Sequence, residues 1–254
     1  YEGGLLDGRP HGNGKMIFAS SGVYEGDWEN GRPHGTGKWV HWNDDEYEGG
    51  VRDGQPHGDG KGKLTYASGN VYEGHLLHGR HHGHGRMTFV NSDFYEGGWE
   101  DGRFHGNGRC TWTYPNGDIY EGDLQDGRRH GRGRLIFANG DVHEGEFLGG
   151  QLQNGKLSYV SGKMYEGALL NGWPHGRGKQ TYANGDVYEG GLDLHGDCHG
   201  HGRLTSTFAN GSVNMFEGAW EHGKPHNGKT RFANGDVYEG EILDGNFHHG
   251  KKTY

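Results

Sequence analysis

The chain of 254 residues has few residues that could cross-link it and no long apolar run that could span a membrane. It has 2 cysteines and 6 prolines, and its apolar residues make up only 30% of the sequence. Cys110 and Cys198 lie far apart and give no disulfide framework, which favours a reducing compartment. No apolar run reaches the length of a transmembrane helix.

Helical spacing and an excess of basic charge are also missing. No window repeats apolar residues at helical intervals, and the 55 glycines recur every few positions, which argues against helices. The formal net charge is −9, so the chain lacks the basic stripe typical of nucleic-acid binders. The same charge opposes a general attraction to anionic lipid surfaces.

What the sequence does contain is a repeat of about 23 residues that opens on an aromatic residue followed by Glu-Gly. We predict one continuous array over residues 1–254, with an irregular repeat at 188–215. The anchor residues that open the repeats are Tyr1, Tyr24, Tyr47, Tyr72, Tyr95, Tyr120, His143, Tyr165, Tyr188, Phe216 and Tyr238. A fixed period indicates one supersecondary unit stacked on copies of itself.

Each repeat has the pattern of a β-hairpin. Short runs that carry aromatic rings, such as 23–28 and 36–42, are separated by Gly, Asn and Pro. A second turn closes the repeat and carries Asn-Gly, a strong hairpin signal because both residues tolerate positive φ. Examples of that turn are Asn116-Gly117, Asn139-Gly140, Asn184-Gly185, Asn210-Gly211 and Asn234-Gly235. We therefore predict an all-β fold without helices: an elongated, single-layer antiparallel sheet of stacked hairpins that forms a twisted rod.

The two faces of this sheet follow from the two-residue period of a strand. The anchor ring, the glycine two residues later and the apolar residue four residues later share one face, as in Tyr24, Gly26 and Trp28. The other face carries the glutamate of each Tyr-Glu-Gly and the Lys or Arg of the next strand. We expect a ladder of cross-strand ion pairs on this charged face, each contributing ~0.2–1 kcal/mol.

The recurring Tyr-Glu-Gly, His-Gly-x-Gly and Asn-Gly elements resemble the MORN repeat (membrane occupation and recognition nexus). Residues 72–85 and 120–140 carry the pattern most closely. The chain departs from it at Gln153, at Pro225-His-Asn-Gly and in the long ninth repeat. The resemblance implies an elongated sheet of hairpins that serves as a scaffold in cytoskeletal and membrane-junction assemblies, cradles a partner helix or self-associates. It also implies phosphoinositide binding as a possible function.

We expect a non-catalytic, cytoplasmic and cytoskeleton-associated scaffold that needs no cofactor and binds no nucleic acid. The face that carries the anchor rings, here called the ring face, would hold a cytoskeletal or helical partner. Alternatively, its rings would pack only against each other. The candidate contact residues are Trp28, Phe89, Trp99, Phe137, Tyr182, Trp220 and Phe232. A homodimer through the C-terminal repeats would use Trp220, His226 and Phe232, since open strand edges invite pairing. The alternatives are a phosphoinositide-binding membrane tether and a carbohydrate or choline reader.

Histidine recurs about ten residues after most anchors, and we expect each of these side chains to pack and hydrogen-bond within its own turn. A reading as a pH sensor also fits, because histidine titrates near neutrality. The ninth repeat adds a cluster with the residue types that zinc prefers. The candidate ligands of a structural zinc ion are His195, Cys198, His199 and His201. The alternative is a solvated loop.

The sequence opens at Tyr1, already in register with a repeat. We therefore expect the chain to be a fragment of a longer protein.

Overall fold

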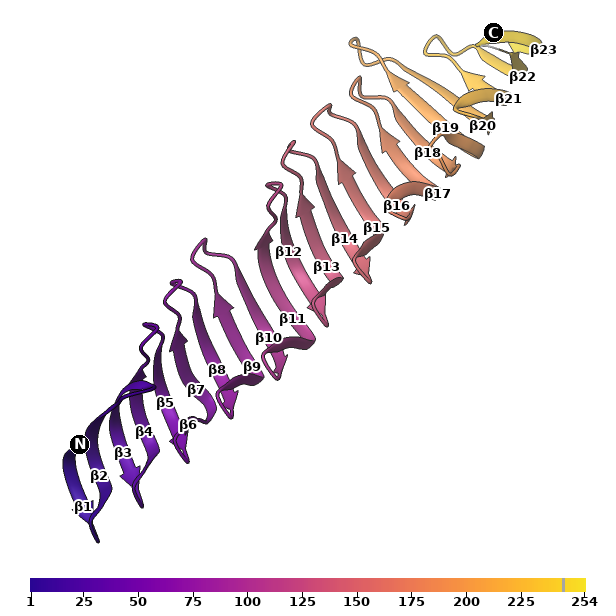
Figure 1. Cartoon of the computed structure of the whole chain (residues 1–254). Helices are drawn as coiled ribbons and strands as arrows, with labels where there is room; N and C mark the ends of the chain where they lie inside the picture. The colour runs from indigo at the N-terminus through magenta and orange to yellow at the C-terminus, as the bar shows by residue number, and fades with distance from the viewer. Residues whose placement is uncertain (244) are drawn as a thin grey trace. The chain divides into compact units, whose positions relative to one another are not determined.

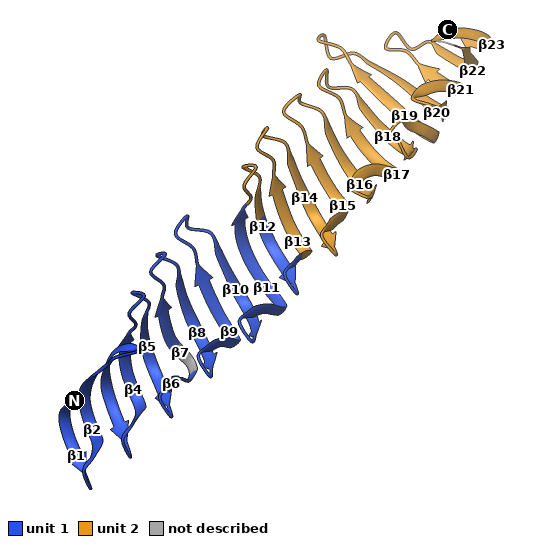
Figure 2. Ribbon diagram, in the orientation of Figure 1, with its two compact units in different colours: residues 1–113, 121–128 blue, residues 114–120, 129–254 orange. Residues whose placement is uncertain are grey.

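A computed structural model describes residues 1–243 and 245–254, apart from the side chains of 59–61. The chain divides into two compact units (Figure 2): the first holds residues 1–113 and 121–128, and the second holds 114–120 and 129–254. All regular secondary structure in these described ranges is strand. They accordingly contain no helix long and apolar enough to cross a membrane.

The strands of the first unit follow one another as antiparallel neighbours (Figure 1). β5 pairs with both the short β6 and β7. The strands are β1 (Glu2–Leu6), β2 (Arg9–Phe18), β3 (Gly22–Glu29), β4 (Arg32–Val40), β5 (Glu46–Arg52), β6 (Gln55–Pro56), β7 (Gly58–Thr65), β8 (Val71–Leu77), β9 (Arg80–Thr88), β10 (Phe94–Glu100) and β11 (Arg103–Thr113). β12 (Ile119–Gln125) has residues in both units.

The second unit continues with the same hairpin order. Its strands are β13 (Arg128–Ile136), β14 (Val142–Leu148), β15 (Gln151–Ser158), β16 (Met164–Leu170), β17 (Trp173–Thr181), β18 (Val187–Leu192), β19 (Cys198–Thr207), β20 (Val213–Glu221), β21 (Lys224–Arg231), β22 (Val237–Leu243) and β23 (Asn246–Thr253). The predicted fold class, an antiparallel sheet of hairpin repeats without helices, is confirmed over the described residues.

The two turns of a repeat have different backbone conformations. The turn inside the hairpin has two residues at positive φ, such as Asn30 (51°) with Gly31 (83°). This is the type I′ pair that matches the twist of antiparallel strands. In the closing turn only the glycine is left-handed, as at Gly117 (88°). There the Asn116 side chain instead accepts the Asp118 N–H at 3.2 Å. The Asn-Gly pair therefore marks the closing turn, as expected, although only its glycine uses a positive φ there.

The core of most repeats is the anchor tyrosine folded over a pair of glycines. Burial alternates along β3, with Tyr24, Gly26 and Trp28 buried and Glu25 exposed. The Tyr24 hydroxyl donates to the Asp27 carbonyl at 3.0 Å. A Cβ atom placed on Gly37, which pairs with Gly26, would fall under 3.0 Å from the Tyr24 ring. Tyr-Glu-Gly recurs because only glycine leaves room for this ring.

The opposite face carries the predicted ladder of ion pairs. Lys15 lies 3.3 Å from Glu25, Lys179 lies 3.6 Å from Glu189, and the other pairs repeat this arrangement. The remaining pairs at 4.0 Å or less include Lys38–Glu46, Lys63–Glu73, Arg86–Glu96, Arg134–Glu144, Arg203–Glu217 and Lys229–Glu239. Their side chains are roughly half exposed, so each pair contributes little to stability, ~1 kcal/mol or less.

Candidate protein-interaction face

The ring face holds two kinds of aromatic side chain, which sequence reasoning did not separate. Anchor rings and their neighbouring tryptophans lie in the core. A second set lies at the end of the second strand, or one residue after it, in nine of the repeats, and is half-buried, or exposed at Phe208. We call this set the outer ring row. It comprises Phe18, Tyr66 and Phe89 in the first unit, and Tyr114, Phe137, Tyr159, Tyr182, Phe208 and Phe232 in the second.

Three predicted contact residues belong to the core. Trp28, Trp99 and Trp220 are 3%, 5% and 6% exposed. Each indole N–H donates to a glycine carbonyl about one repeat earlier, at Gly14, Gly85 and Gly202. These tryptophans have almost no surface to give to a partner, and this corrects their assignment to the contact surface and the place of Trp220 in a dimer interface.

The other four predicted contact residues, Phe89, Phe137, Tyr182 and Phe232, lie in the outer ring row and keep part of their surface exposed. His226 is exposed, and Phe232 packs edge-on against Phe247 with ring centroids 5.7 Å apart. The dimer through the C-terminal repeats stays a prediction.

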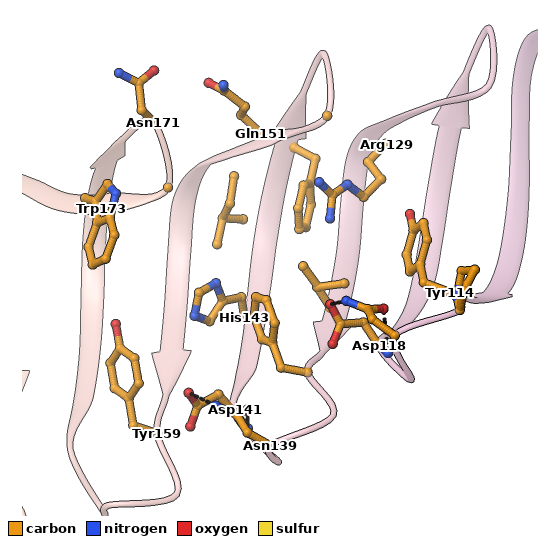
Figure 3. Close-up of a pocket in the computed structure, with 18 residues that line it drawn as sticks. Tyr114, Asp118, Arg129, Asn139, Asp141, His143, Gln151, Tyr159, Asn171 and Trp173 are labelled. Atoms are coloured by element: carbon orange, nitrogen blue, oxygen red, sulfur yellow. Dashed lines mark hydrogen bonds between the residues drawn. The ribbon is translucent and has the colours of Figure 1, made fainter.

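A hollow in the ring face lies within the second unit and has a volume of about 930 Å³. Figure 3 shows it open between the outer ring row and the hairpin turns. Apolar and aromatic side chains form most of its lining. The lining residues are Tyr114, Pro115, Asn116, Asp118, Arg129, Leu135, Phe137, Asn139, Asp141, His143, Phe147, Gly150, Gln151, Leu152, Tyr159, Asn171, Gly172 and Trp173.

The hollow lies beside His143, the anchor of the seventh repeat, where most other repeats have a tyrosine. His143 pairs across the strands with Leu157 and stands edge-on to Phe137, with ring centroids 4.6 Å apart. Its ring does not reach the glycine pair: a Cβ atom on Gly155 would meet the Glu144 carbonyl, not a ring. Burial lowers the pKa of His143, and the charge of Asp141 opposes this shift. The imidazole is therefore neutral near pH 7.

Arg129 is the second unusual residue of the hollow. It occupies the ninth position after the anchor Tyr120, where other repeats have proline (Pro33, Pro174), Phe104 or Leu152. Its guanidinium lies 5.8 Å from the centroid of the Tyr120 ring and 5.5 Å from that of Phe147. Within the described residues it has no carboxylate partner. Sequence reasoning missed Arg129 and His143, although an alignment of the repeats by anchor position exposes both departures.

The fourth repeat buries a histidine instead of opening a hollow. His81 stacks on the Tyr72 ring at 3.8 Å between centroids, and its Nε2 atom lies 2.7 Å from the Tyr66 hydroxyl. Burial lowers the pKa of His81 to about 4. The sequence analysis did not single out His81, because the next residue, His82, is the one that belongs to the regular histidine column. This column comprises the histidines that recur about ten residues after the anchors.

The regular histidine column behaves in two ways. His34 and His105 contact the glutamate of their own turn, Glu29 at 3.4 Å and Glu100 at 3.3 Å. In contrast, the buried Nδ1 atoms of His11, His82 and His175 have no hydrogen-bond partner among the described residues. The expectation of a hydrogen bond within each turn therefore holds only for part of the column.

The candidate zinc ligands of the ninth repeat do not converge. Cys198 is buried on the ring face, with its sulfur 3.5 Å from the Tyr182 hydroxyl, whereas His199 and His201 are exposed at alternate positions of β19. His195 is exposed in the preceding turn. Burial raises the pKa of the Cys198 thiol, which disfavours the thiolate that zinc binds. No group of three or more metal-ligating side chains is arranged around a common point in the described parts of the chain.

Comparison with known proteins identifies the family. The sequence profile of the MORN repeat matches nine segments that together cover more than half of the chain: residues 1–23, 24–40, 47–58, 59–71, 72–94, 95–119, 120–142, 165–187 and 216–237. The chain therefore belongs to the MORN-repeat family, a non-catalytic type of repeat. The repeats that start at 143, 188 and 238 fall outside the matched segments, although each forms a hairpin.

No curated protein sequence matches the chain. Among solved structures, similar ones include the TCP10 domain of Danio rerio CPAP in complex with a STIL peptide, 13% identical, with a TM-score of 0.37 over 92% of this chain and 96% of that one. Another is the TCP domain of Drosophila melanogaster SAS-4 in complex with a proline-rich motif of Ana2, also 13% identical, with a TM-score of 0.32 over 71% and 88%. TM-scores this low extend no function to this chain.

Proposed function

We propose that this chain is a non-catalytic scaffold whose ring face holds a segment of a partner protein. The observation that carries the proposal is the outer ring row, half-buried along one face and interrupted by a hollow of about 930 Å³. Half-exposed aromatic side chains on a preformed sheet are the usual anchors of protein interfaces. The hollow has the size of the pockets, ~300–1,000 Å³, that take a ligand group.

The ring face is better suited to a protein than the charged face is. The aromatic rings are held in place by the strands, so a partner need not order them when it binds. On the charged face, most of the basic side chains already lie within 4.0 Å of a glutamate. An association with the cytoskeleton is part of the proposal, because scaffolds of this family are expected there.

The test uses a photo-crosslinking amino acid, p-benzoylphenylalanine, placed at single positions of the full chain in living cells. We expect substitution at Phe137, Tyr182 or Phe232 to give discrete protein adducts. The matched control is the same substitution at Glu166, which is exposed on the charged face. Equal labelling from both faces would contradict the proposal. An adduct of twice the mass of the chain at Phe232 would identify a second copy as the partner.

The phosphoinositide alternative requires basic side chains that are free of their glutamates. The ion pairs of the charged face occupy most of them, which favours the protein partner. Flotation of the chain with vesicles that contain a phosphoinositide, compared with vesicles that contain only phosphatidylserine at equal charge, tests this alternative. Phosphoinositide-dependent flotation would establish the lipid tether.

A further inference from the structure

The hollow of the second unit differs from the rest of the ring face in three ways that point to one kind of occupant. His143 leaves the space that a tyrosine ring fills elsewhere, Arg129 places a cation in a column of mostly apolar residues, and Trp173 adds a large exposed ring to the lining. Trp173 is 66% exposed.

Trp173 stands out against the same position of other repeats. It pairs across its hairpin with Leu170, where the second and fifth repeats pair Arg32 with Glu29 and Arg103 with Glu100. Tryptophan and arginine are the residue types that most often anchor a bound protein, and this hollow has one of each.

The charged side chains of the hollow are also separated by sign. Figure 3 shows Arg129 near the hairpin-turn end with Gln151, Asn171 and Trp173, whereas Asp118, Asn139 and Asp141 lie toward the closing turns. Each aspartate already accepts a backbone N–H, Asp118 from Ala138 and Asp141 from Val160, both at 2.9 Å. The carboxylates are therefore used by the fold, and the guanidinium is the charged group left for an occupant.

We infer that this hollow binds a peptide segment of a partner protein that inserts a large apolar side chain between Phe137, Tyr159 and Trp173 and places a carboxylate on Arg129. The inference deepens the proposed scaffold function and rests on it. Three residues of the outer ring row, Tyr114, Phe137 and Tyr159, line the hollow, so its apolar surface continues along the row, which suits a peptide better than a compact small molecule. His143, whose ring nitrogens have no hydrogen-bond partner within the described ranges, can bond to the peptide backbone.

A lipid headgroup fits this hollow poorly. One guanidinium facing two aspartates cannot balance a phosphoinositide, which carries several negative charges and is bound by clusters of basic residues. A single carboxylate next to an apolar side chain matches one guanidinium in planar geometry.

The experiment selects random nine-residue peptides, displayed on phage, against the complete 254-residue chain. A counter-selection on the His143→Tyr variant removes peptides that bind elsewhere. We expect the enriched peptides to carry Trp, Phe or Leu with Asp or Glu nearby. Their dissociation constants are then measured by fluorescence anisotropy with synthetic peptides.

Two variants that differ only in position decide the role of the cation. Arg129→Gln should weaken binding of the enriched peptides by about tenfold or more, as expected for a desolvated charge pair. Arg128→Gln removes the same charge from the exposed neighbour and should change binding by less than about twofold, as expected for a rim charge. Replacing the peptide's acid with its amide should weaken binding to the wild-type chain, but not further to Arg129→Gln. Circular dichroism verifies that both variants fold.

Peptides without an acidic residue, or binding that Arg129→Gln leaves unchanged, would overturn the inference. So would a selection in which no peptide remains once the binders of His143→Tyr are removed, or Arg129-dependent flotation of phosphatidylserine vesicles without any enriched peptide. If these results occur while crosslinks persist at Tyr182 and Phe232, the hollow is not the site but the scaffold function stands. The loss of crosslinks along the whole ring face would end both.

Discussion

Two adjacent repeats of the second unit show what the anchor residue does. In the repeat that starts at Tyr165, the tyrosine is fully buried, its hydroxyl donates to the Ala168 carbonyl, and its ring covers Gly178. In the repeat that starts at His143, the same backbone register holds a glycine pair without a ring above it, and a hollow opens. The anchor side chain therefore changes the packing over the glycine pair, while the hairpin forms in both cases.

The largest effect should come from removing the anchor of the filled repeat. Tyr165→Ala deletes a fully buried ring and should lower the free energy of unfolding by ~3–5 kcal/mol. His143→Ala, at the edge of an existing hollow, should cost less than half as much. Urea unfolding followed by tryptophan fluorescence gives both values.

The matched control for these two variants is Tyr254→Ala, since Tyr254 is 90% exposed and its loss should change stability by no more than ~0.5 kcal/mol. If His143→Ala proves as costly as Tyr165→Ala, the open repeat is as tightly packed as the filled one and the comparison fails.

The alternation of the strands made much of this fold predictable. Tyr-Glu-Gly places the ring inward and the glutamate outward whatever the neighbours do, so the sequence predicts the hairpins and both faces. How far a ring on the ring face is exposed depends on its contacts with the adjacent repeats. The periodicity of the sequence does not predict these contacts. For this reason Trp28, Trp99 and Trp220 were assigned to the contact surface, and the hollow beside His143 was missed.

His81 and His143 both have lowered pKa values, and the effect of His81 on stability should depend on pH. His81 has a folded pKa of about 4, below its usual value near 6.5, so the unfolded chain takes up the proton first as the pH falls. Its contribution to stability is complete above pH 6.5 and is lost as the pH falls toward 4. His81→Phe should remove this dependence, and the next repeat accommodates a phenylalanine at the same position, where Phe104 packs against Tyr95 with ring centroids 4.0 Å apart.

Between pH 7.5 and 5, the wild-type chain should lose on the order of 2 kcal/mol more than His81→Phe does. Urea unfolding at the two pH values measures the difference, and the other histidines cancel because both proteins contain them. Equal losses would show that His81 is protonated in the folded protein.

A smaller change in the free energy of unfolding, this time an increase, is expected when the anchor tyrosine is restored in the repeat that starts at His143. His143→Tyr restores the anchor that the other repeats use, and should raise the free energy of unfolding by ~0.5–2 kcal/mol by filling the hollow. His143→Phe separates the ring from the hydroxyl bond to the backbone. A destabilised His143→Tyr chain would mean that the hollow is too shallow for the ring, and that its shape is set by residues other than His143.

The smallest effect concerns the charged face, where the two repeats differ again. Lys179 lies 3.6 Å from Glu189, whereas Lys156 of the open repeat has no ion pair within 4.0 Å among the described residues. Lys179→Met should cost ~0.2–1 kcal/mol at low ionic strength and nothing measurable in 1 M salt, because half-exposed pairs are screened. Lys156→Met should be neutral under both conditions. Urea unfolding at the two salt concentrations gives the four values.

A cost at Lys179 that survives high salt would mean that the lysine stem contributes by packing rather than by charge. The ladder would then help to hold neighbouring hairpins together instead of only keeping that face charged.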